Sequence, residues 1–206
     1  GGDGVGCSAH KFSSGSHAEG RIAGKAAIKF LVDNPGDVTL DASKFEEVKA
    51  EILKPLKTYE EGKGYTVTDD ITPNYIRPKM FLFRLNKIMD EYAGGTSSWY
   101  ITNKPMLERA LEELRMLYED SKFLGADGLH ELMRAWENYH RLWTSEAHVR
   151  HLMFREETRY PGYYYRADFK EVLDQENWHV FTISKWDPAT REWSIRKEPV
   201  QNWLGL

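Results

Sequence analysis

The chain has 206 residues, enough for one domain or for a small domain with part of another. Its formal net charge of -4 provides no basic field, which excludes nucleic acid as an expected partner, and its apolar runs are too short and too often interrupted by charge for a membrane-spanning helix. The single cysteine, Cys7, excludes an internal disulfide framework and favours a cytoplasmic location.

The amino-terminal stretch over residues 2–20 is rich in glycines and small hydroxyl residues. The spacing of Ser16 and Glu19 predicts a capping box that starts a helix over 17–33. Unpaired amides and the helix dipole at such a start favour an anionic or electron-rich ligand. Because glycine-serine loops are common, a loop that caps the helix and binds nothing remains the alternative.

A second helix is predicted over residues 43–58, with a capping box of Ser43 and Glu46 at its start and a kink at Pro55. A polar loop follows over residues 62–70. Two helices thus precede a part of the chain that is mostly helical.

Beyond this loop the apolar spacing predicts an antiparallel bundle of helices joined by short connections. The first begins at Thr72-Pro73, the second opens at Asn103 and Pro105, and a long third covers about 128–156. The final segment alternates in polarity, and the turn over 187–190 predicts a β-hairpin.

Three segments of the amino-terminal stretch, GDG, HKFSSGS and HAEGRIAGKAA, resemble the closing FAD-binding segment of the succinate dehydrogenase/fumarate reductase flavoprotein family. Asp3 stands where the family has glutamate, and Gly20–Gly24 keeps the family's Gly-Arg-Ile-Ala-Gly. Lys11 stands where the family arginine clamps a dicarboxylate, and lysine offers a point charge instead of a planar fork. This departure argues against succinate or fumarate, and the HKFSSGS wording is similar to the alpha subunits of dissimilatory adenylylsulfate reductases.

A second stretch, about 130 residues further on, supports the same resemblance. Residues 155–160, 164–169 and 176–178 resemble the family pattern Glu-Ser-Arg-Gly-x-His-x-Arg-x-Asp-Tyr followed by Asp-x-x-Trp. Tyr160 replaces the family glycine, and Tyr163 or Tyr164 falls at the family histidine, which again is a departure towards the sulfur enzymes.

The resemblance implies a mainly α fold: residues 1–50 complete an α/β FAD-binding domain, and residues 51–206 form a helical domain with a short carboxyl-terminal β-hairpin. It also implies a partial FAD site, whose cofactor-binding positions are Asp3, Gly4, Ser14, Ser16 and His17. In this site the Asp3 carboxylate accepts from a ribityl hydroxyl, and the amides of Ser16 and His17 face the pyrimidine edge of the flavin.

The implied reaction is the two-electron interconversion of adenylylsulfate with AMP and sulfite, in which His10 and Lys11 contact the substrate. The alternative for Lys11 is a pair with a local carboxylate. The implied partner is an iron–sulfur beta subunit that holds two 4Fe–4S clusters, since one cysteine cannot ligate a cluster here. Residues 1–206 alone are expected to be inactive. A fumarate reductase or succinate dehydrogenase flavoprotein, or a helical interaction module without catalysis, are the alternatives.

For the remaining charged, histidine and tryptophan residues a structural role is the primary interpretation. The arginines Arg150, Arg155, Arg159 and Arg166 with the acids Glu156, Glu157 and Asp168 predict a salt-bridge network that ties the last helix to the following loop, with a partner-facing role as the alternative. No metal site is expected from His140, His148 and His151, because neither a zincin spacing nor a cysteine accompanies them. Trp136 and Trp143 are predicted to belong to the core stripe of the long helix.

Overall fold

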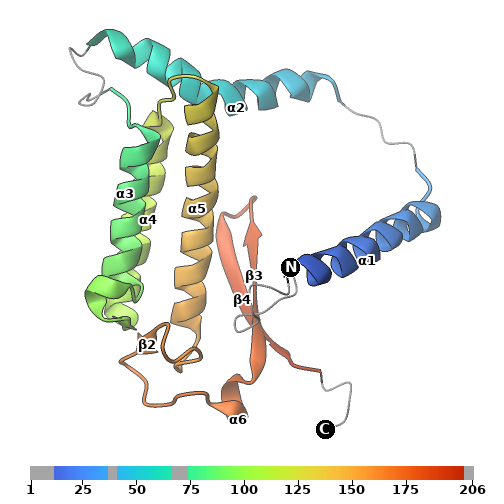
Figure 1. The fold of residues 1–206 in the computed structure, drawn as a ribbon, viewed down its shortest axis with the longest axis vertical. Coiled ribbons are helices and arrows are strands. Elements are labelled where there is room, and N and C mark those ends of the chain that lie inside the picture. Colours follow the sequence, from blue (N-terminus) through green and yellow to red (C-terminus); the bar gives the residue numbers. More distant parts are fainter. Residues whose placement is uncertain (1–11, 37–40, 66–73, 202–206) are drawn as a thin grey trace. The chain divides into compact units, whose positions relative to one another are not determined.

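The computed structural model describes residues 12–36, 41–65 and 74–201, drawn in colour in Figure 1. The chain divides into two compact units, residues 1–47 and 48–206, and each is described by itself. The division falls inside helix α2 (Ser43–Gly62). The assignment of residues 1–50 to an FAD-binding domain stays a prediction.

The first unit contains helix α1 (Phe12–Asp33), which begins earlier than the predicted residue 17. Ser16 therefore lies inside the helix, and the predicted capping box at this residue is wrong. The segment before Ser16 holds no proline, so no residue there sterically blocks the helical turn that precedes Ser16. The side chains of Ile22 and Phe30 are exposed, so the described residues leave the apolar face of α1 uncovered.

Helix α2 extends the second predicted helix to Gly62, and the short helix η2 (Lys63–Tyr65) follows it. Asp41 accepts hydrogen bonds from the amide (3.0 Å) and the hydroxyl (2.5 Å) of Ser43. Ser43 is the first helical residue, so the prediction that it is the N-cap is wrong, because an acceptor two residues earlier takes its amide. Pro55 lies inside the helix and is buried.

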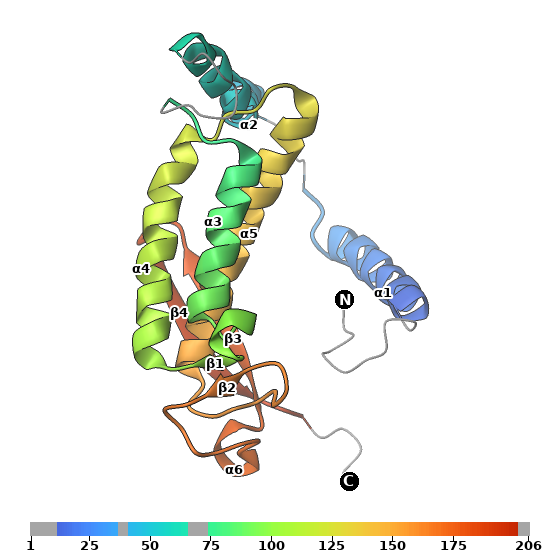
Figure 2. The same ribbon diagram turned by 60° about the vertical axis from the view of Figure 1, so that its left-hand side comes forward.

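Three long helices, α3 (Pro78–Tyr92), α4 (Lys104–Asp120) and α5 (Leu129–Phe154), lie side by side in the second unit. Figures 1 and 2 show them alternating in direction, which confirms the predicted antiparallel bundle. Apolar side chains of all three form the core between them: Phe81, Leu85, Ile88, Leu107, Ala110, Leu114, Leu117, Leu142, Val149 and Leu152. Burial of these chains drives the bundle together.

The starts of α3 and α4 compare differently with their predictions. Asn103 caps α4, since its side chain accepts from the amide of Met106 at 3.0 Å, as its position before Pro105 predicts. Thr72-Pro73, the predicted start of α3, lie outside the described residues, and residues 74–77 that follow them are not helical. Ile76 is extended there and forms a parallel bridge to Leu124, so the helix begins only at Pro78.

The chain ends its described part in the predicted hairpin. Strand β3 (Val180–Asp187) pairs antiparallel with β4 (Glu192–Pro199). The Asp187 carboxylate accepts from the amide of Ala189 and fixes the turn between them (2.9 Å). The remaining elements are η3 (Thr96–Ser98), η4 (Ser121–Phe123), α6 (Gln175–Trp178) and the short parallel pair β1 (Ile101–Thr102) and β2 (Tyr165–Arg166). The parallel pair was not predicted, because two-residue strands carry no alternation.

Candidate functional site

Most of the predicted flavin and substrate residues cannot be placed in the structure. Asp3, Gly4, His10 and Lys11 lie outside the described residues, and of Ser14 and Ser16 only the helical backbone is described. His17 lies on α1 with an exposed side chain. Their roles stay predictions.

The start of α1 changes which amides are free for a ligand. An α-helix leaves the amides of its first turn without an internal partner. With α1 beginning at Phe12, these amides belong to residues 12–14, and those of Ser16 and His17 fall in the hydrogen-bonded part of the helix. Ser14 is therefore the predicted cofactor residue that lies nearest to the donors.

A buried carboxylate forms the best-defined polar site in the second unit. The side chain of Glu157 is 0% exposed and accepts from Arg155 Nη1 at 2.8 Å and from Arg159 Nε at 2.5 Å. Its second oxygen accepts from the amide of Asp174 at 2.7 Å. One acid thus pairs with two guanidinium groups that lie just past the end of α5.

The same two arginines also bind main-chain carbonyls. Arg155 donates to Trp178 O (3.1 Å) and Val180 O (2.7 Å), and Arg159 donates to Asp174 O (3.0 Å). These bonds join the end of α5 to α6 and to the start of β3. The guanidinium groups serve the fold, as the predicted salt-bridge network requires.

Arg166 makes a second, separate link at the end of α5. It is 3% exposed and donates to the carbonyls of Leu152 and Arg155, which the helix leaves unpaired. Its Nε and Nη2 form a bidentate pair with Asp168, at 3.0 and 2.8 Å. Asp168 also accepts from the amide of Lys104, so it connects the start of α4 to the end of α5.

The electrostatics of Asp168 follow from this arrangement. Partial burial acts to raise the pKa of its carboxyl, but the hydrogen bonds from Arg166 and from the Lys104 amide outweigh burial and lower that pKa. Asp168 therefore stays ionised and holds its two partners across the neutral range.

Two members of the predicted network do not belong to it. Arg150 pairs with Glu146 on its own helix at 2.8 Å. Glu156 is exposed and makes no ion pair within the part of the chain that the structure describes. Which of the two glutamates, Glu156 or Glu157, pairs with the arginines depends on the direction in which the chain leaves α5. Two adjacent glutamates in the sequence give no sign of that direction.

His151, Trp136 and Trp143, all on α5, each lie in a different environment. His151 Nδ1 lies 2.9 Å from Thr182 Oγ1, and burial, followed by the nearby positive charge of Arg155, lowers the pKa of the His151 imidazole. Trp136 is half-buried and donates to Ile52 O at 3.0 Å. Trp143 is exposed, so its predicted place in the core is wrong: it lines a groove of about 980 Å³ between α4, α5 and the hairpin.

Residues 12–36, 41–65 and 74–201 contain no group of three or more His, Cys, Asp or Glu placed to hold a metal ion. In the same ranges, none of the helices combines the length and apolarity that crossing a membrane requires.

Comparisons with known proteins place this geometry in a family. Residues 84–203 match the family model described as the fumarate reductase flavoprotein C-terminus. The chain is 50% identical over 197 residues to the adenylylsulfate reductase subunit alpha of Megalodesulfovibrio gigas, which covers 96% of this chain and 29% of that protein.

Solved structures agree. Adenylylsulfate reductase of the hyperthermophile Archaeoglobus fulgidus matches with a TM-score of 0.88 and 50% identity, over 94% of this chain and 30% of that one. The Sdh1 complex of Mycobacterium smegmatis shares the fold, with a TM-score of 0.64 and 17% identity over 87% of this chain and 28% of that one.

The predicted mainly helical fold with its carboxyl-terminal hairpin is thereby confirmed. The chain spans about 30% of the length of the relatives that it matches. It belongs to the succinate dehydrogenase/fumarate reductase flavoprotein family, and residues 84–203 correspond to the carboxyl-terminal domain of that family.

Proposed function

We propose that the chain is the carboxyl-terminal part of an adenylylsulfate reductase alpha subunit. One observation carries this proposal: identity to adenylylsulfate reductases is 50% over nearly the whole chain, whereas identity to the Sdh1 complex is 17%. A structure of such a reductase with sulfite as a covalent adduct matches with the same TM-score of 0.88.

The reaction that this assignment implies is a two-electron reduction of sulfur. The bond between sulfur and the bridging oxygen of adenylylsulfate breaks, AMP keeps that oxygen, and sulfur leaves as sulfite. A bound flavin supplies the two electrons to this step. In the reverse direction AMP and sulfite give adenylylsulfate and return two electrons.

The residues of the amino-terminal segment have a donor chemistry that fits a flavin. The free amides at the start of α1 suit the electron-rich edge of the ring, and Ser14 lies among them. In the proposed site Asp3 and Gly4 complete the contacts to the cofactor, whereas the amides of Ser16 and His17 are already paired within the helix and do not donate to it. All of these proposed residues lie in the amino-terminal stretch over residues 2–20.

Lys11 and His10 are proposed to contact the substrate. An ammonium group is a compact point charge, which balances the charge of a sulfite or phosphosulfate group without the planar fork that a dicarboxylate favours. His10 next to it can hold a proton near neutral pH. This pair is the chemical difference that separates the proposed substrate from succinate and fumarate.

The second unit has a supporting role in this proposal. The clusters at Glu157 and Arg166 fix the loop and hairpin that follow α5. An iron–sulfur beta subunit is the proposed source of electrons, as the family resemblance implies; within this chain, Cys7 alone does not provide the four thiolates of a cluster. The cytoplasmic location expected from the sequence is part of the proposal.

The test uses the full-length subunit together with its electron-donating partner. We expect oxidation of reduced methyl viologen that depends on adenylylsulfate and not on fumarate. Lys11→Met should lower kcat/KM roughly 100-fold, a loss typical of removing one charge-stabilising donor. Lys29→Met, an exposed lysine on α1, is the matched control and should leave the rate unchanged. Turnover of fumarate, or equal rates for both variants, would contradict the assignment.

A further inference from the structure

The carboxyl-terminal hairpin is joined to the end of α5 through the first residues of β3. His151 Nδ1 lies 2.9 Å from Thr182 Oγ1. Arg155 donates to the carbonyls of Trp178 (3.1 Å) and Val180 (2.7 Å). His151 and Arg155 are four residues apart and therefore lie on one face of the helix end. An imidazole and a guanidinium thus hold the hairpin to α5.

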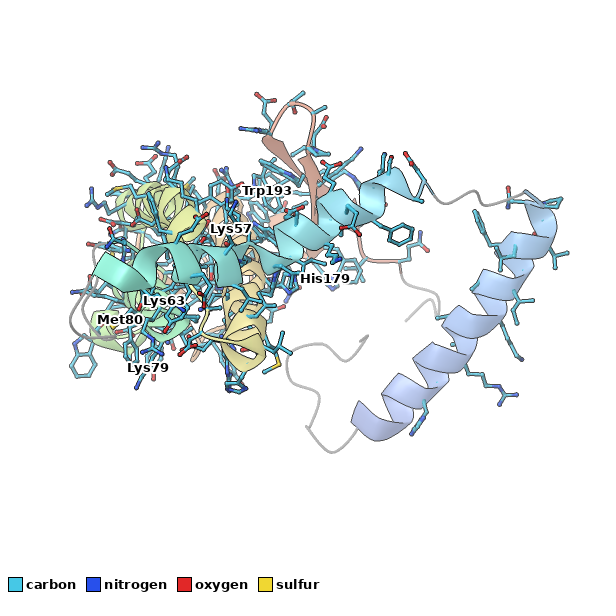
Figure 3. All side chains as sticks on the ribbon, turned by 90° about the horizontal axis from the view of Figure 1, so that it is seen from above. Lys57, Lys63, Lys79, Met80, His179 and Trp193 are labelled. Atoms are coloured by element: carbon cyan, nitrogen blue, oxygen red, sulfur yellow. The ribbon has the colours of Figure 1, made fainter. Side chains whose placement is uncertain are left out.

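A cavity of about 580 Å³ lies beside this joint and gathers cationic and titratable groups. His148, one helical turn before His151, lines it together with Arg155 and Arg159. His179, which Figure 3 labels, directly precedes β3 and also lines the cavity. The wall of one cavity thus contains three histidines and two arginines.

Two carboxylates lie around these arginines, and both are engaged. The buried Glu157 pairs with both guanidinium groups. Asp174 caps α6 by accepting from two main-chain amides, and the charge of Arg159 acts on it. Within the part of the chain that the structure describes, neither His148 nor His151 forms an ion pair with a carboxylate.

The second strand of the hairpin adds another cation. Lys197 on β4 is the cross-strand partner of Thr182, and its Nζ lies 3.5 Å from the centre of the Trp178 ring. The same ammonium group donates to Asn177 O at 3.1 Å. The fixed charges named here, three cations and two carboxylates, sum to +1 before any histidine takes up a proton.

This environment disfavours the charged form of both histidines on α5. Partial burial, followed by the charge of Arg155, lowers the pKa of His151, and partial burial, followed by the charge of His151, lowers the pKa of His148. In an opened hairpin, where water reaches both rings, each takes up a proton at a higher pH than in the closed one. Acid below the ordinary pKa of 6.5 therefore favours the open state.

Protonation changes the charge at the joint and not its hydrogen-bonding capacity. The Thr182 hydroxyl can donate to a neutral ring nitrogen or accept from a protonated one. Once both rings are charged, His148, His151 and Arg155 place three positive charges on successive turns of one helix face. Like charges at this spacing repel each other.

We propose that His148, His151 and Arg155 form a pH-sensitive clasp, which holds the carboxyl-terminal hairpin to α5 at neutral pH and releases it in mildly acidic solution. The opening is local, because the apolar core between α3, α4 and α5 contains none of these three residues. The proposal uses only residues of the second unit and does not depend on the reductase assignment.

The test is amide hydrogen exchange in the full-length subunit at pH values from 7.5 to 5.5, measured by mass spectrometry and corrected for the intrinsic effect of pH on exchange. Peptides from β3 report on the hairpin, and peptides from residues 107–117 of α4 serve as the internal reference. Protection of β3 should fall at least roughly 3-fold, as two like-charge contacts at helical spacing imply, with a midpoint below pH 6.5. Protection of α4 should stay constant.

His148→Gln combined with His151→Gln removes both titrating rings and keeps polar side chains, so the protection of β3 should then be equal at both ends of the pH range. The matched control His130→Gln replaces an exposed histidine at the start of α5, outside the cavity, and should respond to pH as the unmodified protein does.

The unmodified protein alone can overturn the proposal, through equal protection of β3 at pH 7.5 and 5.5 or a midpoint above 6.5. A pH response of β3 that persists in the double variant would overturn it as well. So would an equal loss of protection in α4, because acid would then unfold the bundle and not release the hairpin.

Discussion

Replacing the buried carboxylate of Glu157 tests the polar cluster at the end of α5. Its oxygens accept three hydrogen bonds, from Arg155, Arg159 and the amide of Asp174, and its side chain is 0% exposed. Removing one partner of a buried ion pair costs about 3–5 kcal/mol, because the charge left behind stays buried without compensation.

Glu157→Gln keeps the shape and one acceptor oxygen. Both arginines also keep their bonds to main-chain carbonyls, to Trp178 and Val180 for Arg155 and to Asp174 for Arg159. We therefore expect the lower end of the range, a loss of about 3 kcal/mol in the free energy of unfolding, and about 4 kcal/mol for Glu157→Ala, which also leaves a cavity.

The assay is urea denaturation of the chain, followed by far-UV circular dichroism. Glu156→Gln is the matched control, because it makes the same chemical change one residue earlier at an exposed position without an ion pair in the described part of the chain. Its effect should stay within about 0.5 kcal/mol. If the two glutamine variants unfold at the same urea concentration, Glu157 does not hold the cluster together.

Three further predictions concern other elements of the second unit. Asn103→Ala removes the side chain that accepts from the Met106 amide and should cost about 1 kcal/mol in urea denaturation, whereas Asn103→Ser should restore most of it. Gly125→Ala places a methyl group 2.7 Å from the ring of Tyr75 and should cost about 1–3 kcal/mol; an unchanged midpoint would mean that the ring moves freely. Burial and the charge of Arg155 lower the pKa of His151, so the imidazole takes up a proton at a higher pH in the unfolded chain than in the folded one, and the free energy of unfolding should fall as the pH drops below the ordinary value of 6.5. A urea midpoint that stays constant between about pH 7 and 5, or the same pH dependence in His151→Gln, would contradict this.

Local signals in the sequence were enough to predict the parts of the fold that depend on neighbouring residues. Asn103 before Pro105 indicates the start of α4, and the alternating segment with its turn at Asp187 indicates the hairpin, because in both cases the deciding hydrogen bonds join residues close together in the chain. The start of α3 was misplaced for the opposite reason. Ile76 is held by Leu124, which is distant in sequence and leaves no local mark.

The polar cluster was predicted in kind but not in detail. Arg155, Arg159 and Glu157 do form a network, yet sequence spacing could not exclude Glu156 or show that Arg150 pairs within its own helix. Helical periodicity likewise predicted Trp143 to lie in the core. An apolar stripe has the same spacing whether its side chains pack inside the bundle or line an open groove, so the sequence does not distinguish the two.

The most direct test of the central claim is a titration of the full-length subunit with sulfite, monitored by absorption spectroscopy. If this chain is the carboxyl-terminal part of an adenylylsulfate reductase, the purified protein should be yellow and should lose its oxidised-flavin absorption on addition of sulfite, while succinate and fumarate leave the spectrum unchanged. A colourless protein, or a yellow protein whose spectrum responds to fumarate or succinate and not to sulfite, would contradict the claim.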